Sequence, residues 1–142
     1  MLELKFKKLH DDVIIPKKAH ETDACFDVYS PIDIVLPAKS LTRVPLGFSV
    51  QCPMDFKLCF YSRSSMGAKG IWLGNSIGII DEDYRGECMA VFYNSGDREY
   101  DIRKGDRILQ CALEKVYYFE IKEVEELSKT KRGEGGFGSS GK

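Results

Sequence analysis

The chain has 142 residues, of which 43% are hydrophobic and 30% charged, and its formal net charge is -1. This length is enough for one domain with a real core, and the near-zero net charge excludes a protein that binds nucleic acid through bulk positive charge. The longest apolar runs are only a few residues long and the N-terminus lacks an apolar signal core, so neither a membrane nor a nucleic acid is expected as a partner.

Strand signals dominate the chain. Residues 2–6 alternate apolar and charged side chains, which is typical of a half-buried strand. Residues 32–36 repeat this alternation between Pro31 and Pro37, two residues that punctuate strands. Further strands are expected, in chain order, at 41–52, 56–61, 77–80, 88–93, 100–102 and 108–118.

Only residues 64–69 and 123–128 look helical, and both stretches are short. Many short strands separated by turn residues predict an all-β fold, a single-domain distorted jelly roll or β-sandwich with one or two short helices. Residues 133–141 include five glycines, each of which adds backbone entropy that ordering must remove. The chain is therefore expected to divide into a β domain, residues 1–127, and a flexible C-terminal tail, residues 128–142.

The five cysteines are odd in number and form no CxxC pair. Most of them lie in apolar stretches, where a buried reduced thiol acts as a small hydrophobic side chain. His10 and His20 have no metal-ligand spacing beside them, so a zinc site is not expected. Reduced thiols predict an intracellular protein, and we expect it in the cytoplasm.

Polar residues interrupt the strand pattern at several places. Asp81 directly follows the apolar run 77–80, where partial desolvation suits a general base, although for this residue taken alone an aspartate that starts a tight turn is the better explanation. Asp27 lies between two apolar residues of a β run and is either a buried orienting carboxylate or an ordinary polar residue of an edge strand. Gln110 stands inside the apolar run 108–113. Burying its amide without a partner costs about 1 to 3 kcal/mol, so it faces solvent, a partner chain or a ligand.

Two segments carry groups that suit phosphate. At 63–65, hydroxyls at a helix start can cap the helix, or exposed N–H groups beside Arg63 can bind an anion. In the tail, Arg132, glycine amides, hydroxyls and the Phe137 ring can grip a phosphorylated base, although a frayed Gly/Ser-rich terminus has the same composition. No Walker loop, GxGxxG fingerprint or Ser-His-Asp order is present.

The order of these segments along the chain is more specific than any one of them. They read DACFDV at 23–28, RSS at 63–65, GIIDEDYRG at 78–86, GDRILQ at 105–110 and RGEGGFGS at 132–139. This series resembles the five ordered motifs of the trimeric dUTPases, and the third and fifth segments are long and specific. The resemblance spans the chain from about residue 20 to its end.

The resemblance implies an activity and a set of catalytic residues. This family cleaves dUTP to dUMP and pyrophosphate with Mg²⁺, which limits uracil in DNA and supplies dUMP. By position, Asp81 corresponds to the carboxylate that activates the attacking water at the α-phosphate, and Asp27 to a carboxylate one layer behind it. Arg63 and Gln110 correspond to catalytic phosphate contacts. Mg²⁺ is held by triphosphate oxygens and water in this family, so no direct protein ligand is expected.

The resemblance also implies the substrate contacts. The stretch from Asn75 to Ile80 corresponds to the hairpin that reads uracil, and Tyr84 to the ring that packs on deoxyribose and selects against a ribose 2′-OH. In the tail, Arg132 and Ser139 correspond to phosphate contacts and Phe137 to the ring that stacks on uracil. The substrate-binding positions implied are Ser64, Ser65, Asn75, Gly78, Ile80, Tyr84, Arg132, Phe137, Gly138 and Ser139.

The family assembles each site from three subunits of a homotrimer, which the resemblance implies here as well. Three positions depart from the family pattern: Cys25 stands for a usual glycine, Ser62 for a proline and Ser65 for a frequent glycine. Two other functions stay open: a dCTP deaminase of the same fold, and a nucleotide-binding regulatory protein. The glycine-rich tail and Tyr84 favour the dUTPase over the deaminase.

Overall fold

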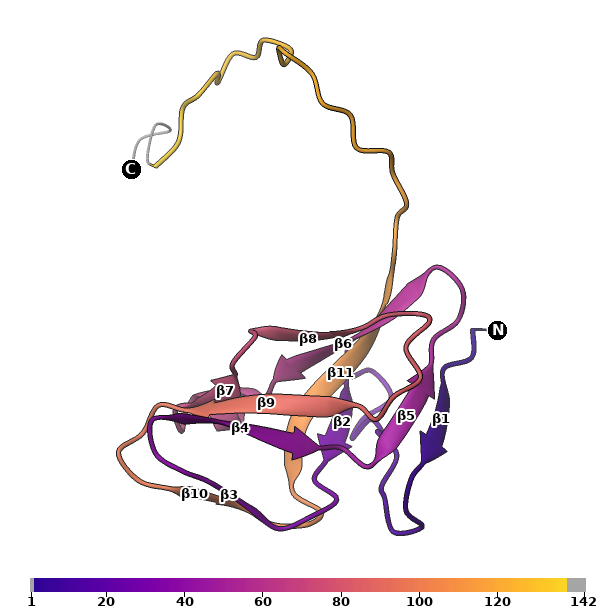
Figure 1. The fold of residues 1–142 in the computed structure, drawn as a ribbon, viewed down its shortest axis with the longest axis vertical. Coiled ribbons are helices and arrows are strands. Elements are labelled where there is room, and N and C mark those ends of the chain that lie inside the picture. The colour runs from indigo at the N-terminus through magenta and orange to yellow at the C-terminus, as the bar shows by residue number, and fades with distance from the viewer. Residues whose placement is uncertain (1, 138–142) are drawn as a thin grey trace.

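The computed structural model describes residues 2–137 and is built almost entirely of strands (Figure 1). A four-stranded antiparallel sheet has the order β2-β11-β6-β8, and a three-stranded sheet has the order β4-β9-β7. Two strand pairs, β1 with β5 and β10 with β3, complete the body. The elements are β1 (Lys5–Lys8), β2 (Phe26–Tyr29), β3 (Ile34–Leu36), β4 (Ser40–Pro45), β5 (Phe48–Gln51), β6 (Phe56–Ser62), α1 (Ser64–Gly67), β7 (Ile71–Leu73), β8 (Ile77–Ile80), β9 (Met89–Asn94), β10 (Tyr100–Ile102) and β11 (Arg107–Lys115).

The expected all-β fold is confirmed, with differences at particular strands. The first strand begins at Lys5, and the run expected at 41–52 is two strands, β4 and β5. Gly47 breaks this run because its φ is +74°, and a Cβ there would lie 2.7 Å from Val13 Cγ2. Strand β7 was not expected, since its three residues give too short an alternation.

One of the two expected helices forms. Helix α1 spans Ser64–Gly67, within the expected stretch, but its N-cap is Arg63 and no side chain caps it, so the hydroxyl-cap interpretation is wrong. The helix expected at 123–128 is absent, and every residue there is exposed. A short helix needs an apolar face packed on a core, and this segment has no core beside it.

The core lies between the sheets and is centred on aromatic side chains. The rings of Phe48 and Phe6 meet edge to face with centroids 5.3 Å apart, and Phe60 lies beyond Phe48 at 6.5 Å. All five cysteines are free thiols, as expected, and all except Cys25 are buried. Burial raises the pKa of both the Cys88 and the Cys111 thiol to about 12.

After β11 ends at Lys115, the chain leaves the body as an extended arm (Figure 1). Its side chains are exposed from residue 117 to residue 134. The hydrogen bonds of residues 130–135 join arm residues to one another. The domain boundary expected at residue 127 stays a prediction. Within residues 2–137, no helix has the length and apolar character needed to cross a membrane.

Candidate active site

Three polar side chains stand in one row across the four-stranded sheet. Asp27 of β2 lies opposite Gln110 of β11, and Gln110 lies opposite Tyr61 of β6. Side chains directly opposite each other in an antiparallel sheet point to the same face, so the three project together. Segments 23–28, 61–65 and 105–110, far apart in the sequence, therefore meet at one place.

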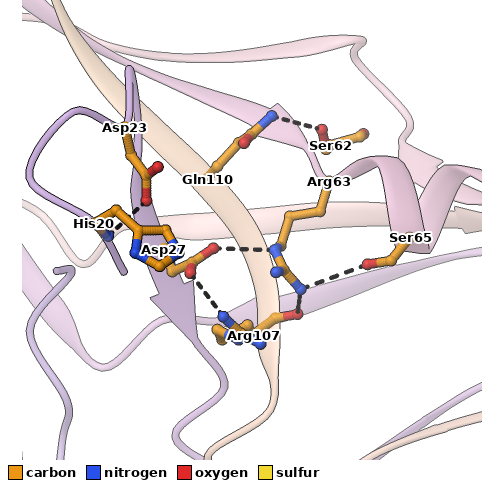
Figure 2. Close-up of polar contacts among 8 residues, drawn as sticks. All are labelled: His20, Asp23, Asp27, Ser62, Arg63, Ser65, Arg107 and Gln110. Carbon is orange, nitrogen blue, oxygen red and sulfur yellow. Dashed lines mark hydrogen bonds and ion pairs between the residues drawn. The ribbon is translucent and has the colours of Figure 1, made fainter. Parts of the chain in front are cut away.

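A network of charges centres on Asp27, whose side chain is only 14% exposed (Figure 2). Arg63 Nε lies 3.0 Å from one carboxylate oxygen, and Arg107 Nη1 lies 3.2 Å from the other. Arg63 Nη1 also donates to the Arg107 carbonyl at 3.0 Å and lies 3.5 Å from Ser65 Oγ. Because one nearly buried carboxylate holds both guanidinium groups, their positions are fixed before any ligand arrives.

The backbone of β11 brings Arg107 to this network. Its pairing with β2 shifts by one residue between Arg107 and Leu109, which is a β-bulge. The turn before the strand contains Gly105 with a φ of +86°, and the Asp106 carboxylate accepts the Arg103 N–H at 2.8 Å. Sequence reasoning assigned no role to Arg107. Its place in the motif at 105–110 was the available signal, but the contact with Asp27 depends on the bulge.

The same geometry bears on the interpretations left open for Asp27 and Gln110. Asp27 lies on an edge strand and orients two guanidinium groups through its ion pairs. Gln110 is half-buried and donates from Nε2 to the Ser62 carbonyl at 3.2 Å, which leaves its amide oxygen available on the shared face. Beside it, Tyr61 Oη donates to Glu114, a hydrogen bond that raises the pKa of Tyr61 and lowers the pKa of Glu114.

The hairpin expected at Asn75–Ile80 does not form between β7 and β8, because β7 pairs with β9 and β8 with β6, so a turn joins strands of two different sheets. This turn exposes Asn75, and Ser76 adopts a φ of +65°. Gly78 lies within β8 directly opposite Phe60 of β6, and a Cβ there would lie 3.2 Å from Phe60 Cβ, so a side chain at this position would crowd its cross-strand neighbour. Ile80 is buried and anchors the far end of β8.

Asp81 and Tyr84 line a shallow pocket of about 240 Å³ beyond β8. The Tyr84 ring lies over Gly86, where a Cβ would come 2.4 Å from the hydroxyl, and the hydroxyl donates to the Glu87 carbonyl at 3.0 Å. Asp81 itself is exposed, and its carbonyl accepts the Tyr84 N–H at 3.2 Å. The desolvation expected for Asp81 is therefore wrong for a single chain, because the apolar strand ends before the carboxylate.

Asp81 does not join the Asp27 network within one chain. Strands β2 and β8 are the two edges of the sheet, three strand spacings or about 14 Å apart. Along the strands, Ile77 pairs with Tyr61, and Asp81 follows four residues later, so Asp81 lies a further distance of about 13 Å from the row that contains Asp27.

The described part of the tail is also remote from this network. Arg132 and Phe137 are exposed on the arm, which extends away from the body (Figure 1). Arg132 Nε donates to the Gly135 carbonyl at 2.7 Å within the arm itself. Gly138 and Ser139, expected to contact substrate, lie outside the described residues.

The next question is whether the chain provides a metal site of its own. In residues 2–137, no three or more His, Cys, Asp or Glu side chains gather to hold a metal ion. Mg²⁺ keeps several waters and binds through one or two carboxylates together with substrate phosphates, so a dedicated protein cage is not required. The two guanidinium groups beside Asp27 and Gln110 suit the phosphates that would carry such a cation.

Comparison with known proteins identifies the family of this chain. The profile of the dUTPase family matches residues 11–141. The chain belongs to the dUTPase family.

Two relatives and one solved structure illustrate the similarity. A deoxyuridine 5′-triphosphate nucleotidohydrolase of Clostridioides difficile is 38% identical, over 99% of both chains. Another from Helicobacter pylori strain J99 is 33% identical, over 99% of this chain and 97% of its own. The dUTPase of Staphylococcus bacteriophage 80alpha, solved with dUpNHpp, is 28% identical, with a TM-score of 0.88 and 98% of each chain covered.

Proposed function

We propose that this chain hydrolyses dUTP to dUMP and pyrophosphate, which limits uracil in DNA and supplies dUMP. The observation that carries the proposal is the row of Asp27 and Gln110 beside the paired Arg63 and Arg107. Such a face offers an amide, a carboxylate and two fixed cations to a polyphosphate. Relatives named for this activity over nearly their full length support it.

The residues of this face position the triphosphate. Arg63 offers the guanidinium edge that Asp27 leaves free, and Ser64 and Ser65 at the start of α1 supply hydroxyls and N–H groups. Gln110 contacts the α-phosphate. Mg²⁺, when bound through the phosphates and water, offsets charge that develops on the bridging and leaving oxygens.

Asp81 acts as the general base. Its exposed carboxylate is free to accept a proton from the water that attacks the α-phosphorus, and the bond to the bridging oxygen then breaks to release pyrophosphate. Because Asp81 lies far from Asp27 in its own chain, the Asp81 that serves a given phosphate site comes from another subunit. This separation supports the homotrimer with shared sites.

The remaining contacts select the nucleotide and close the site. The Asn75–Ile80 segment reads uracil through its backbone, and the pairing of β8 with β6 holds that backbone in place. Tyr84 packs on deoxyribose and leaves no room for a 2′-OH. The arm brings Arg132 to the phosphates and Phe137 to the base, together with Gly138 and Ser139, and so excludes water from the anhydride.

One coupled experiment tests the proposal: pyrophosphate release from dUTP, dCTP, dTTP and UTP in Mg²⁺, with the molecular mass measured in solution. We expect release from dUTP alone and a mass of three chains. Ammonia release from dCTP would establish a deaminase instead. Tight dUTP binding without pyrophosphate release would establish a nucleotide-binding regulatory protein.

A further inference from the structure

A second polar depression opens beside the Asp27 network, and Gln110 is not among the residues that line it. It has a volume of about 290 Å³, and its wall includes Arg63, Ser65, Lys69, Tyr100, Asp106 and Arg107. Two of these residues, Arg63 and Arg107, also bind Asp27. The depression is therefore continuous with the proposed phosphate face, and we call it the distal pocket.

Lys69 is the one charged residue of this pocket's lining that lies outside the five segments. Its Nζ donates to Tyr100 Oη at 3.2 Å and lies 5.2 Å from the centre of the Tyr100 ring. The next residue, Gly70, has a φ of +76°, and its carbonyl accepts both the N–H and the hydroxyl of Ser95 at 2.9 Å. The backbone after Lys69 is thus fixed, and an aromatic ring directs its ammonium group.

The charge of Lys69 is not neutralised by a carboxylate. Arg63 and Arg107 share Asp27, and Asp106 is engaged by the Arg103 N–H of its own turn. None of the ion pairs in residues 2–137 includes Lys69. The distal pocket and its adjoining carboxylate therefore carry one positive charge in excess, although the whole chain has a net charge of -1.

We infer that Lys69, held by Tyr100, binds the phosphate of the substrate that is most distant from the sugar. This inference rests on the proposed function, because it extends the same phosphate face into the distal pocket. An ammonium on a flexible stem is a point charge that suits a terminal phosphate, which carries the most charge of the three. A nucleoside monophosphate cannot reach this contact, so Lys69 selects for triphosphates over monophosphates.

The test compares two ligands in the full-length assembled protein. Lys69→Gln keeps most of the side-chain length and removes the charge. We expect it to weaken binding of dUpNHpp about tenfold, as for loss of one charged hydrogen bond, and to leave dUMP binding unchanged in calorimetry. The KM for dUTP should rise by the same factor with little change in kcat, because the contact forms before the reaction.

Two further variants give the controls. Lys69→Arg should restore dUpNHpp binding to within about threefold, since the charge returns. Lys7→Gln removes an exposed lysine on β1 and should change neither affinity. Equal losses for dUpNHpp and dUMP would show a structural role for Lys69, and unchanged binding of both would show a surface lysine. Either result in an active wild-type enzyme overturns this inference alone, whereas a wild-type chain that neither cleaves dUTP nor binds dUpNHpp overturns the proposed function as well.

Discussion

Two regions of this molecule differ in how completely one chain builds them. The phosphate face around Asp27 is assembled from three segments of a single chain, with its guanidinium groups 3.0 and 3.2 Å from one carboxylate. Asp81 and the arm are exposed and lie apart from that face. Under the proposed function, binding of phosphate therefore needs little rearrangement, whereas catalysis requires parts that another subunit or an ordering step must supply.

The strongest test of this division is Asp81→Asn. Removing the general base should lower kcat for dUTP by a factor of about 10³, within the usual 10² to 10⁴ contribution of such a group. Binding of dUpNHpp should stay within about twofold, because the phosphate face is built without Asp81. Stopped-flow turnover and calorimetry check the two quantities. A variant that retains wild-type kcat would remove Asp81 from the mechanism.

Deleting residues 131–142 tests the arm. We expect kcat/KM to fall about a hundredfold, because Arg132 and Phe137 no longer close the site and water enters it. The melting temperature should not change, since the hydrogen bonds of residues 130–135 stay within the arm. Differential scanning calorimetry is the check. A lower melting temperature would mean that the arm stabilises the body.

The Tyr84→Ala variant tests whether Tyr84 selects deoxyribose over ribose. The ring lies over Gly86 and is 43% exposed, so its removal should open space for a 2′-OH without disturbing the core. The ratio of kcat/KM for UTP to that for dUTP should rise about tenfold, the range of a single lost steric contact. Tyr84→Phe, which keeps the ring, is the matched control. An unaltered ratio in Tyr84→Ala would contradict sugar selection by this residue.

The smallest effect is expected inside the phosphate face itself. Arg107→Gln leaves Asp27 with one of its two partners, and Arg63 still holds the carboxylate. We expect kcat/KM for dUTP to fall by a factor of about five to ten, as for loss of a positioning contact, together with a lower melting temperature. Arg107→Lys tests whether charge alone is sufficient. If neither variant differs from wild type, the face is not preorganised by this ion pair.

Much of the fold was predictable because alternation of apolar and polar residues reports strands directly. Strands β3, β8 and β10 lie inside their expected runs. The errors come from tertiary contacts that strand periodicity does not report. The break at Gly47 depends on Val13, which lies far away in the sequence, and the helix expected at 123–128 lacked a surface on which to pack.

The residues of the candidate site likewise fall into those that the sequence predicted and those that it did not. Sequence order alone singled out Asp27, Arg63, Gln110 and Asp81. It missed Arg107, whose role depends on a β-bulge, and Lys69, which tertiary folding places against Tyr100. It also expected Asp81 to be desolvated, a property that depends on what packs beside the residue and not on the residues before it.

The sequence by itself determined the family, the all-β class and the chemical groups that the chain can offer, because residue types and strand periodicity are local properties. Only the tertiary structure decided which of those groups meet. Pairing of β2 with β11 and of β11 with β6 places Asp27, Gln110 and Tyr61 in one row. The same sheet holds Asp81 at its opposite edge, since strand order is set by burial of the common core and not by proximity along the chain.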